Sequence, residues 1–275
     1  MILHCGQFNL DLTSPRVMGI LNTTPDSFSD GGNFTQTHIA VEHALKLIND
    51  GADVLDIGGE STRPNATPIS LQEELDRVIP VIEALVSKVN IPLSIDTYKP
   101  SVMRAAIAAG ASMVNDVRAL QEEGAVEAIA ETGVAVCLMH MQGTPQTMQD
   151  NPSYDDVVRE VSEFLMARVD VCMKAGIANN RMLIDPGFGF GKTRVHNITL
   201  VQELASLSEF DLPLLVGLSR KSVLGQMTGN DVDARVFASV AAAVISAMKG
   251  ANMLRVHDVK ATVEALKVVS VIAAG

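Results

Sequence analysis

The chain alternates eight times between a short apolar run and a helical pattern, and this alternation limits its fold more than any other feature. Each run is of strand length and precedes a segment whose apolar residues recur at helical spacing. Alternating strands and helices imply parallel strands, and eight such units favour a (β/α)8 TIM barrel over an open sheet. The predicted strands are residues 17–21, 54–57, 93–96, 113–116, 135–140, 183–185, 214–219 and 253–257.

The alternation continues along the 275 residues without a linker or a shift in composition, so we expect one domain over residues 1–275. Before the first strand, residues 2–12 alternate loosely around Gly6 and predict a small N-terminal β-hairpin that closes the bottom of the barrel. A doubly wound sheet is the alternative architecture. It is disfavoured because no G-x-G-x-x-G follows the first predicted strand.

Composition limits the partners that the chain can bind. Its formal net charge is -11 at pH 7, and neither nucleic acid nor an anionic membrane favours an acidic surface. We therefore expect small-molecule substrates, with any anionic one held by a local group of arginine and lysine side chains. The three cysteines form no C-x-x-C pair, and the most apolar stretch, residues 236–248, is too short to span a bilayer. We expect a cytoplasmic protein.

Polar residues stand where several of the predicted strands end. In a (β/α)8 barrel the catalytic groups lie at these carboxyl ends, which meet at one mouth of the barrel. Alternation along a strand places Arg255 and His257 on one face, and it does the same for Ser219 and Lys221 if their strand continues that far. The candidates at the mouth are Asn22, Thr62, Asp96, Asn115, His140, Asp185, Ser219, Lys221, Arg255 and His257.

The basic candidates indicate an anion site. Arg255 and His257 together can clamp an anion, with Arg63 and Lys221 as further cations. Each of these side chains alone is more often a solvated surface charge, so the argument rests on their convergence at one mouth. A Schiff-base role for Lys221 is a further reading, but the neighbouring Arg220 and a facing anion favour charge pairing instead.

The acceptors Asp96, Asn115 and Asp185 complement these cations. A carboxylate can accept two parallel N–H bonds from an amino-pyrimidinone ring, and an asparagine can satisfy a ring nitrogen and a neighbouring donor together. A buried carboxylate such as Asp185 is costly unless a donor-rich ligand or a fixed partner meets it. A structural alternative is that these three side chains only cap the ends of their own strands. Paired carboxylates are also found in glycosidases. His140 between two methionines fits a core histidine as readily as a ligand.

The glycine-rich stretch 182–192 ends in Gly-Lys, but it is no phosphate loop because Pro186 stands where that motif needs glycine. No His-x-x-Glu-His motif or cysteine cluster predicts a zinc site. A magnesium ion bound mainly by substrate phosphates, with Asn22 as one oxygen ligand, fits the candidates better.

Five motifs of the chain carry a family resemblance: MGILNTTPDSFSDGG at residues 18–32, GGESTRP at 58–64, DPGFGFGK at 185–192, SRKS at 219–222 and RVH at 255–257. They closely resemble those of the bacterial dihydropteroate synthases, and the resemblance covers the whole chain. It implies condensation of 6-hydroxymethyl-7,8-dihydropterin diphosphate with 4-aminobenzoate, which gives 7,8-dihydropteroate and diphosphate in folate synthesis. It also implies a homodimer and competition by sulfonamide inhibitors.

The same resemblance assigns roles to the candidate residues. It implies that Asp96, Lys221, Arg255 and His257 take part in catalysis and that Asn22 binds magnesium. The pterin diphosphate would be bound by Thr62, Asp96, Asn115, Asp185 and Lys221, with Arg255 and His257 on the diphosphate. The 4-aminobenzoate would be bordered by Phe28, Arg63, Pro64, Ser219 and Lys221.

Two related functions remain as alternatives within the fold. A pterin-binding methyltransferase acting on a corrinoid protein would share Asp96, Asn115 and Asp185 but would not need the basic residues for diphosphate. A catalytically silent pterin-binding subunit would not need them either. The sequence departs from the family at Asn65 and Ala238, where glycine is usual. We also predict that residues 23–32 and 60–68 close over the aromatic acid after the pterin diphosphate and magnesium have bound.

Overall fold

The computed structural model describes residues 1–23, 33–64, 66–207 and 210–273. Within this part of the chain, eight parallel strands lie in the order β8-β7-β6-β5-β4-β3-β10-β9. A parallel bridge between Ile184 and Leu214 joins the two outermost strands, so the sheet closes into the predicted (β/α)8 barrel. The strands are β3 (Arg16–Asn22), β4 (Val54–Gly58), β5 (Leu93–Asp96), β6 (Met113–Asp116), β7 (Ala135–Met139), β8 (Met182–Asp185), β9 (Leu215–Val216) and β10 (Met253–Val256).

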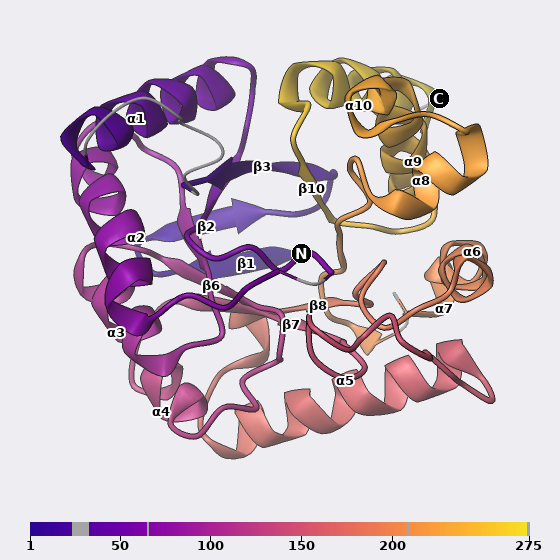
Figure 1. Ribbon diagram of the computed structural model, residues 1–275, viewed down its shortest axis with the longest axis horizontal. Coiled ribbons are helices and arrows are strands. Elements are labelled where there is room, and N and C mark those ends of the chain that lie inside the picture. Colours follow the sequence, from indigo (N-terminus) through magenta and orange to yellow (C-terminus); the bar gives the residue numbers. More distant parts are fainter. Residues whose placement is uncertain (24–32, 65, 208–209, 274–275) are drawn as a thin grey trace.

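Helices surround the strands on the outside of the barrel, as Figure 1 shows. None of the helices in the described ranges is both long and apolar enough to cross a membrane. The helices are α1 (Asn33–Asn49), α2 (Leu71–Val86), α3 (Pro100–Ala108), α4 (Ala125–Ala130), α5 (Val157–Lys174), α6 (Arg194–Gln202), α7 (Leu204–Leu207), α8 (Ser222–Thr228), α9 (Val236–Met248) and α10 (Val259–Ala273).

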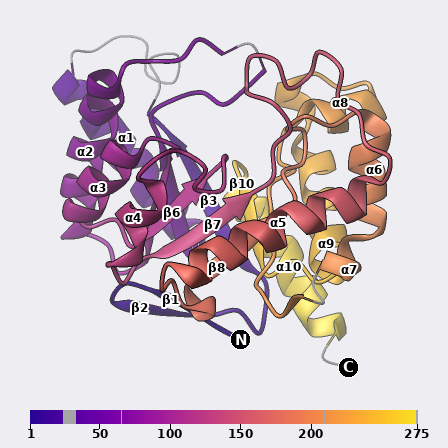
Figure 2. The same ribbon diagram turned by 90° about the horizontal axis from the view of Figure 1, so that it is seen from below.

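The predicted hairpin is formed by β1 (Ile2–Cys5) and β2 (Phe8–Asp11), which pair antiparallel. Figure 2 shows the hairpin across one end of the barrel. Leu3 and Cys5 are fully buried, and they belong to a cluster with inward-facing strand residues such as Met18 and Cys137. The N–H of Gly6 donates to the carbonyl of Gly133 at 2.8 Å. The hairpin therefore forms an apolar floor under the barrel.

Side-chain alternation along each strand produces two separate environments. Outward-facing residues such as Leu55, Ile95 and Val114 pack under the helices in the main core. The inward-facing residues are apolar near the floor and become polar toward the other end, where Asp56, Asp96 and other buried polar groups lie. The opposite end of the barrel from the hairpin is therefore the mouth.

The strand predicted at residues 214–219 is shorter in the structure. Only Leu215 and Val216 form the β9 ladder with β10. The chain then turns, because Arg220 has a left-handed backbone (φ 57°) that a strand cannot contain. Lys221 is consequently the N-cap residue of α8 and not a strand residue. The condition under which Ser219 and Lys221 would share a strand face is not met.

Candidate active site

Arg255 lies at the centre of the polar layer inside the barrel. Its Nε donates to Asp56 Oδ2 at 2.6 Å and its Nη2 donates to Asp96 Oδ2 at 2.6 Å. Asp56 also accepts from Ser94 Oγ at 2.6 Å and from Asn115 Nδ2 at 3.0 Å. One guanidinium on β10 thus links that strand to β4 and β5, across the intervening β3.

Asp56 was missed by the sequence analysis although it carries this network. It is fully buried on an otherwise apolar strand. Strand alternation could have shown that Asp56 faces the barrel interior, because Asp56 is on the same face of β4 as Val54 and Gly58. A charged residue at an inward position of a barrel strand needs a partner, and Arg255 supplies it.

Asp96 has one oxygen without a partner. Its Oδ1 is buried and makes no hydrogen bond within the described residues, whereas its Oδ2 pairs with Arg255. Burial raises the pKa of Asp96, the Arg255 guanidinium opposes the rise, and the neighbouring Asp56 adds to it. An unsatisfied buried acceptor is costly, so Asp96 Oδ1 is suited to a donor that arrives with a ligand.

Asp185 and Lys221 form the other side of the mouth. Asp185 is 4% exposed, and its Oδ1 accepts from the Gly187 N–H at 2.7 Å. Lys221 Nζ donates to the Phe188 carbonyl and lies 4.6 Å from the centre of the Phe190 ring. Burial lowers the pKa of Lys221 to about 8, and the negative charge of Asp185 limits the fall. Lys221 is therefore mostly protonated at pH 7.

The glycine-rich turn after β8 is held from inside by Lys192, which is 2% exposed. Lys192 Nζ lies 2.8 Å from His140 Nδ1 and donates to the carbonyls of Gly187 and Phe190, both at 3.0 Å. Gly187 has φ 68°, and a Cβ there would lie 1.8 Å from the His140 carbonyl oxygen. Lys192 and His140 are thus structural groups that shape the wall beside Asp185.

Ser219 and His257 meet at the end of β10. Ser219 Oγ accepts from the His257 backbone N–H at 3.1 Å and lies 3.1 Å from its Nδ1. Burial, together with the nearby charges of Arg255 and Arg220, lowers the pKa of His257 to about 4. His257 is therefore neutral at pH 7, so it can offer a hydrogen bond to an anion but not the positive charge expected from the sequence.

The remaining predicted residues within the described ranges lie around the rim. Asn22 ends β3 and is partly exposed, and a Cβ on Gly58 would lie 3.9 Å from its Oδ1. Thr62 is partly exposed, whereas Arg63 and Pro64 are exposed. Phe28 and Asn65 lie outside the described residues.

Comparison with known proteins identifies the family. A family model described as pterin binding enzyme matches residues 18–257. The dihydropteroate synthase of Escherichia coli K12 is 54% identical over 269 residues, which are 98% of this chain and 95% of that protein. This chain belongs to the dihydropteroate synthase family. The predicted family and its transferase activity, the synthesis of dihydropteroate, are confirmed.

Solved structures of dihydropteroate synthases have the same fold. The Yersinia pestis enzyme, in a complex with a sulfonamide drug, has a TM-score of 0.95 and 52% identity, with 100% of both chains covered. The Xanthomonas albilineans enzyme, in complex with 7,8-dihydropteroate, has a TM-score of 0.89 and 48% identity, covering 100% of this chain and 99% of that one.

The donor groups at the mouth determine whether the expected magnesium ion fits there. No group of three or more His, Cys, Asp or Glu side chains in the described ranges could hold a metal ion. Magnesium keeps several waters and often takes one or two protein oxygens together with substrate phosphates. The partly exposed Asn22 amide at the rim fits such a site, because it supplies one oxygen and leaves the rest to water and substrate.

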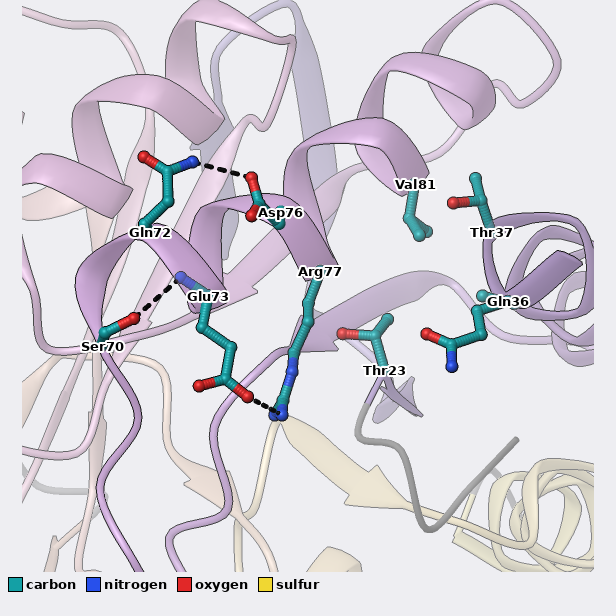
Figure 3. Close-up of a pocket in the computed structure, with 10 residues that line it drawn as sticks. Thr23, Gln36, Thr37, Ser70, Gln72, Glu73, Asp76, Arg77 and Val81 are labelled. Carbon is teal, nitrogen blue, oxygen red and sulfur yellow. Dashed lines mark hydrogen bonds and ion pairs between the residues drawn. The ribbon is translucent and has the colours of Figure 1, made fainter. Parts of the chain in front are cut away.

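A separate pocket of about 430 Å³ lies beside the mouth, between α1 and α2 (Figure 3). The close-up shows its charged lining already paired, since Arg77 Nη2 lies 2.5 Å from Glu73 Oε1. Its lining includes Thr23, next to Asn22, but none of the predicted substrate-binding residues. At the start of α2, Ser70 Oγ accepts from the Glu73 N–H at 3.1 Å and so caps the helix.

Proposed function

We propose that the mouth of the barrel binds 6-hydroxymethyl-7,8-dihydropterin diphosphate through Asp96, Asn115 and Asp185 and condenses it with 4-aminobenzoate. The observation that carries this proposal is the unpartnered, buried Oδ1 of Asp96, which faces the same interior as Asn115 and Asp185. The amino-pyrimidinone edge of a pterin presents N–H donors in a row, and carboxylate oxygens are their best acceptors.

The leaving diphosphate is the more demanding part of the reaction. In the proposed step the methylene carbon of the pterin loses its bond to the diphosphate oxygen and forms a bond to the aminobenzoate nitrogen, and the nitrogen then releases a proton to water. Lys221 supplies a positive charge at pH 7, and neutral His257 supplies a hydrogen bond to the phosphate oxygens. Such preorganised groups stabilise the charge that develops on the leaving oxygens.

Arg255 and Asp96 contribute on the pterin side. Electron donation from the reduced ring should make bond breaking run ahead of attack, which places positive charge on the pterin. The Asp96 carboxylate would stabilise that charge, while Arg255 adds positive potential toward the diphosphate. The aromatic amine is already neutral at pH 7, so it needs placement more than a strong base.

Magnesium is the proposed cofactor. When bound, it would neutralise charge on the diphosphate oxygens and so assist their departure. Asn22 would hold it through the amide oxygen at the rim, and Thr62 would bind the same diphosphate.

The aminobenzoate would lie against Arg63, Pro64 and Ser219, with Lys221 between the two substrates, and Phe28 is proposed as a further contact. The sulfonamide complex of the similar Y. pestis enzyme supports binding of sulfonamides, which mimic 4-aminobenzoate, to this chain. The 7,8-dihydropteroate complex of the X. albilineans enzyme supports a mouth that accepts both halves of the product.

A homodimer is the proposed assembly. The neighbouring helices α9 and α10 carry exposed apolar side chains, among them Phe237 (87% exposed), Met248 (73%) and Val271 (76%). Exposed apolar side chains on neighbouring helices favour association, because association removes them from water. A cytoplasmic location remains our expectation, and the buried free thiols of Cys5, Cys137 and Cys172 suit a reducing compartment.

One assay tests the proposed reaction against its rivals. Diphosphate release is measured with the dihydropterin diphosphate alone, with 4-aminobenzoate alone and with both. We expect release only with both, together with an equal amount of dihydropteroate. A methyltransferase or a silent pterin-binding subunit would bind the pterin and release no diphosphate, and that result would overturn the proposal.

A further inference from the structure

Lys99, directly before α3, holds three acceptors from separate parts of the chain. Its Nζ lies 2.5 Å from Glu60 Oε2, 2.7 Å from Glu74 Oε2 and 2.9 Å from the carbonyl oxygen of Ile69. An ammonium group has three N–H donors, so all of them are used. The Glu74 side chain is 1% exposed and that of Glu60 is 8% exposed.

Two of the acceptors, Glu60 and Ile69, stand at the two ends of one segment of the rim, and the third, Glu74, lies on α2. Glu60 precedes Thr62, Arg63 and Pro64 in sequence, and Ile69 follows them. A single side chain therefore joins both ends of this segment. Tyr98 also holds the Glu60 end of the segment, because its hydroxyl donates to Glu60 Oε1 at 3.1 Å.

The described residues in the middle of the segment, 61–64 and 66–68, make weaker contacts. The Arg63 N–H lies 3.4 Å from Ser61 Oγ, and Ala66 accepts from Gln146 Nε2 at 3.2 Å. Arg63 and Pro64 are exposed. The segment thus has fixed ends and an exposed centre, which is the arrangement a rim segment needs if its centre is to meet a substrate in a reproducible place.

The charge balance around Glu60 and Glu74 depends on Lys99. Two largely buried carboxylates, Glu60 and Glu74, share the single charge of Lys99, and Glu74 Oε1 has no partner within the described residues. Burial lowers the pKa of Lys99, but the two carboxylates more than offset this and raise it overall. Without the ammonium, the two carboxylates would repel each other and the ends of the segment would separate.

We propose that Lys99 is a positioning residue for the aminobenzoate site: by tying Glu60 and Ile69 together, it sets where Thr62, Arg63 and Pro64 stand at the mouth. The inference rests on the proposed function, because that function gives Arg63 and Pro64 their role beside the aminobenzoate. Lys99 contacts the segment and not the reacting atoms, so its effect should appear in the binding of the second substrate.

The test compares Lys99→Met with wild type. We expect the KM for 4-aminobenzoate to rise by about tenfold or more, with kcat changed less, because binding of the second substrate is what the segment controls. The Kd for a pterin without its diphosphate, which Thr62 does not contact, should stay within about twofold by calorimetry, and this measurement also shows that the variant is folded. Lys99→Arg should recover part of the loss, since it restores the charge.

Two comparisons complete the design. Lys46→Met removes an exposed ion pair with Asp50 (2.5 Å) and should leave both constants unchanged. If Lys99→Met does not fold, Glu60→Gln keeps the shape of the anchor while removing one charge, and it should raise the same KM severalfold.

Arg63→Ala separates the inference from the proposed function. If Arg63→Ala raises the KM and Lys99→Met leaves it within about twofold of wild type, Lys99 does not position the segment and the inference is wrong. If Arg63→Ala itself has no effect, the proposed role of the segment fails, and the inference fails with it. Equal weakening of pterin and aminobenzoate by Lys99→Met would also overturn the inference, because it would mean a general effect on the barrel.

Discussion

Arg255 and Asp56 form an ion pair of 2.6 Å inside the barrel, on strands that both border β3. Asp56 is fully buried, and the same guanidinium also neutralises Asp96. A residue predicted as a clamp for the leaving diphosphate therefore also balances the interior charge of the fold. Substitution of Arg255 must affect stability as well as catalysis.

Arg255→Ala is expected to lower the free energy of unfolding by about 3–5 kcal/mol, because two buried carboxylates lose their shared cation. Urea denaturation measures the change. Arg16→Ala is the matched control, since its pair with Asp53 is longer (3.3 Å) and partly exposed, and it should cost much less. A loss for Arg255→Ala no larger than for the control would show that the pair does not stabilise the interior.

The pH dependence of catalysis should report Lys221. Its pKa is lowered to about 8, so the charge that attracts the diphosphate is lost as the pH rises through 8. We expect kcat/KM for the pterin diphosphate to fall over that range and Lys221→Arg to move the fall to higher pH. The stability trend has the opposite sign: between pH 8 and the ordinary lysine pKa the unfolded chain binds more protons, so stability rises with pH. A fall at the same pH in Lys221→Arg would remove Lys221 from this role.

Chelation should separate diphosphate binding from pterin recognition. Removal of magnesium with EDTA is expected to lower kcat/KM for the pterin diphosphate, and added magnesium should restore it, while a pterin without diphosphate binds unchanged. Asn22→Ala should raise the magnesium concentration for half-maximal activity by about tenfold. Asn9→Ala, on the floor hairpin, should have no effect. Full activity in EDTA would contradict the proposed cofactor.

The strands could be predicted well where polar residues bound an apolar run. The predictions at 93–96 and 113–116 match β5 and β6 at both ends, since each run stops at an aspartate that begins a loop. The prediction at 214–219 was too long because the apolar run continues to Leu218, whereas only Leu215 and Val216 form the strand and Ser219 and Arg220 already form a turn.

The candidate site was predicted in its residues but not in their pairing. Alternation placed Asp96, Asn115 and Arg255 at the mouth, yet no pattern could show that Arg255 joins Asp96 to Asp56, 199 residues away from Arg255 in sequence. Lys99 shows the same limit. Its position before a helix-opening proline has no chemical signature, and its role follows only from the tertiary contacts with Glu60, Ile69 and Glu74.

The central claim is that the interior acceptors of this barrel recognise the pterin ring, and calorimetry of the Asp185→Asn variant tests it most directly. The substitution replaces a charged acceptor with an amide that presents N–H groups to the donor edge of the ligand. We expect the affinity for a non-hydrolysable pterin to fall by about 2–5 kcal/mol, with the thermal unfolding temperature nearly retained. Asp170→Asn, on the exposed face of α5, is the control and should bind as wild type does. An unchanged affinity in a folded Asp185→Asn variant would contradict the account.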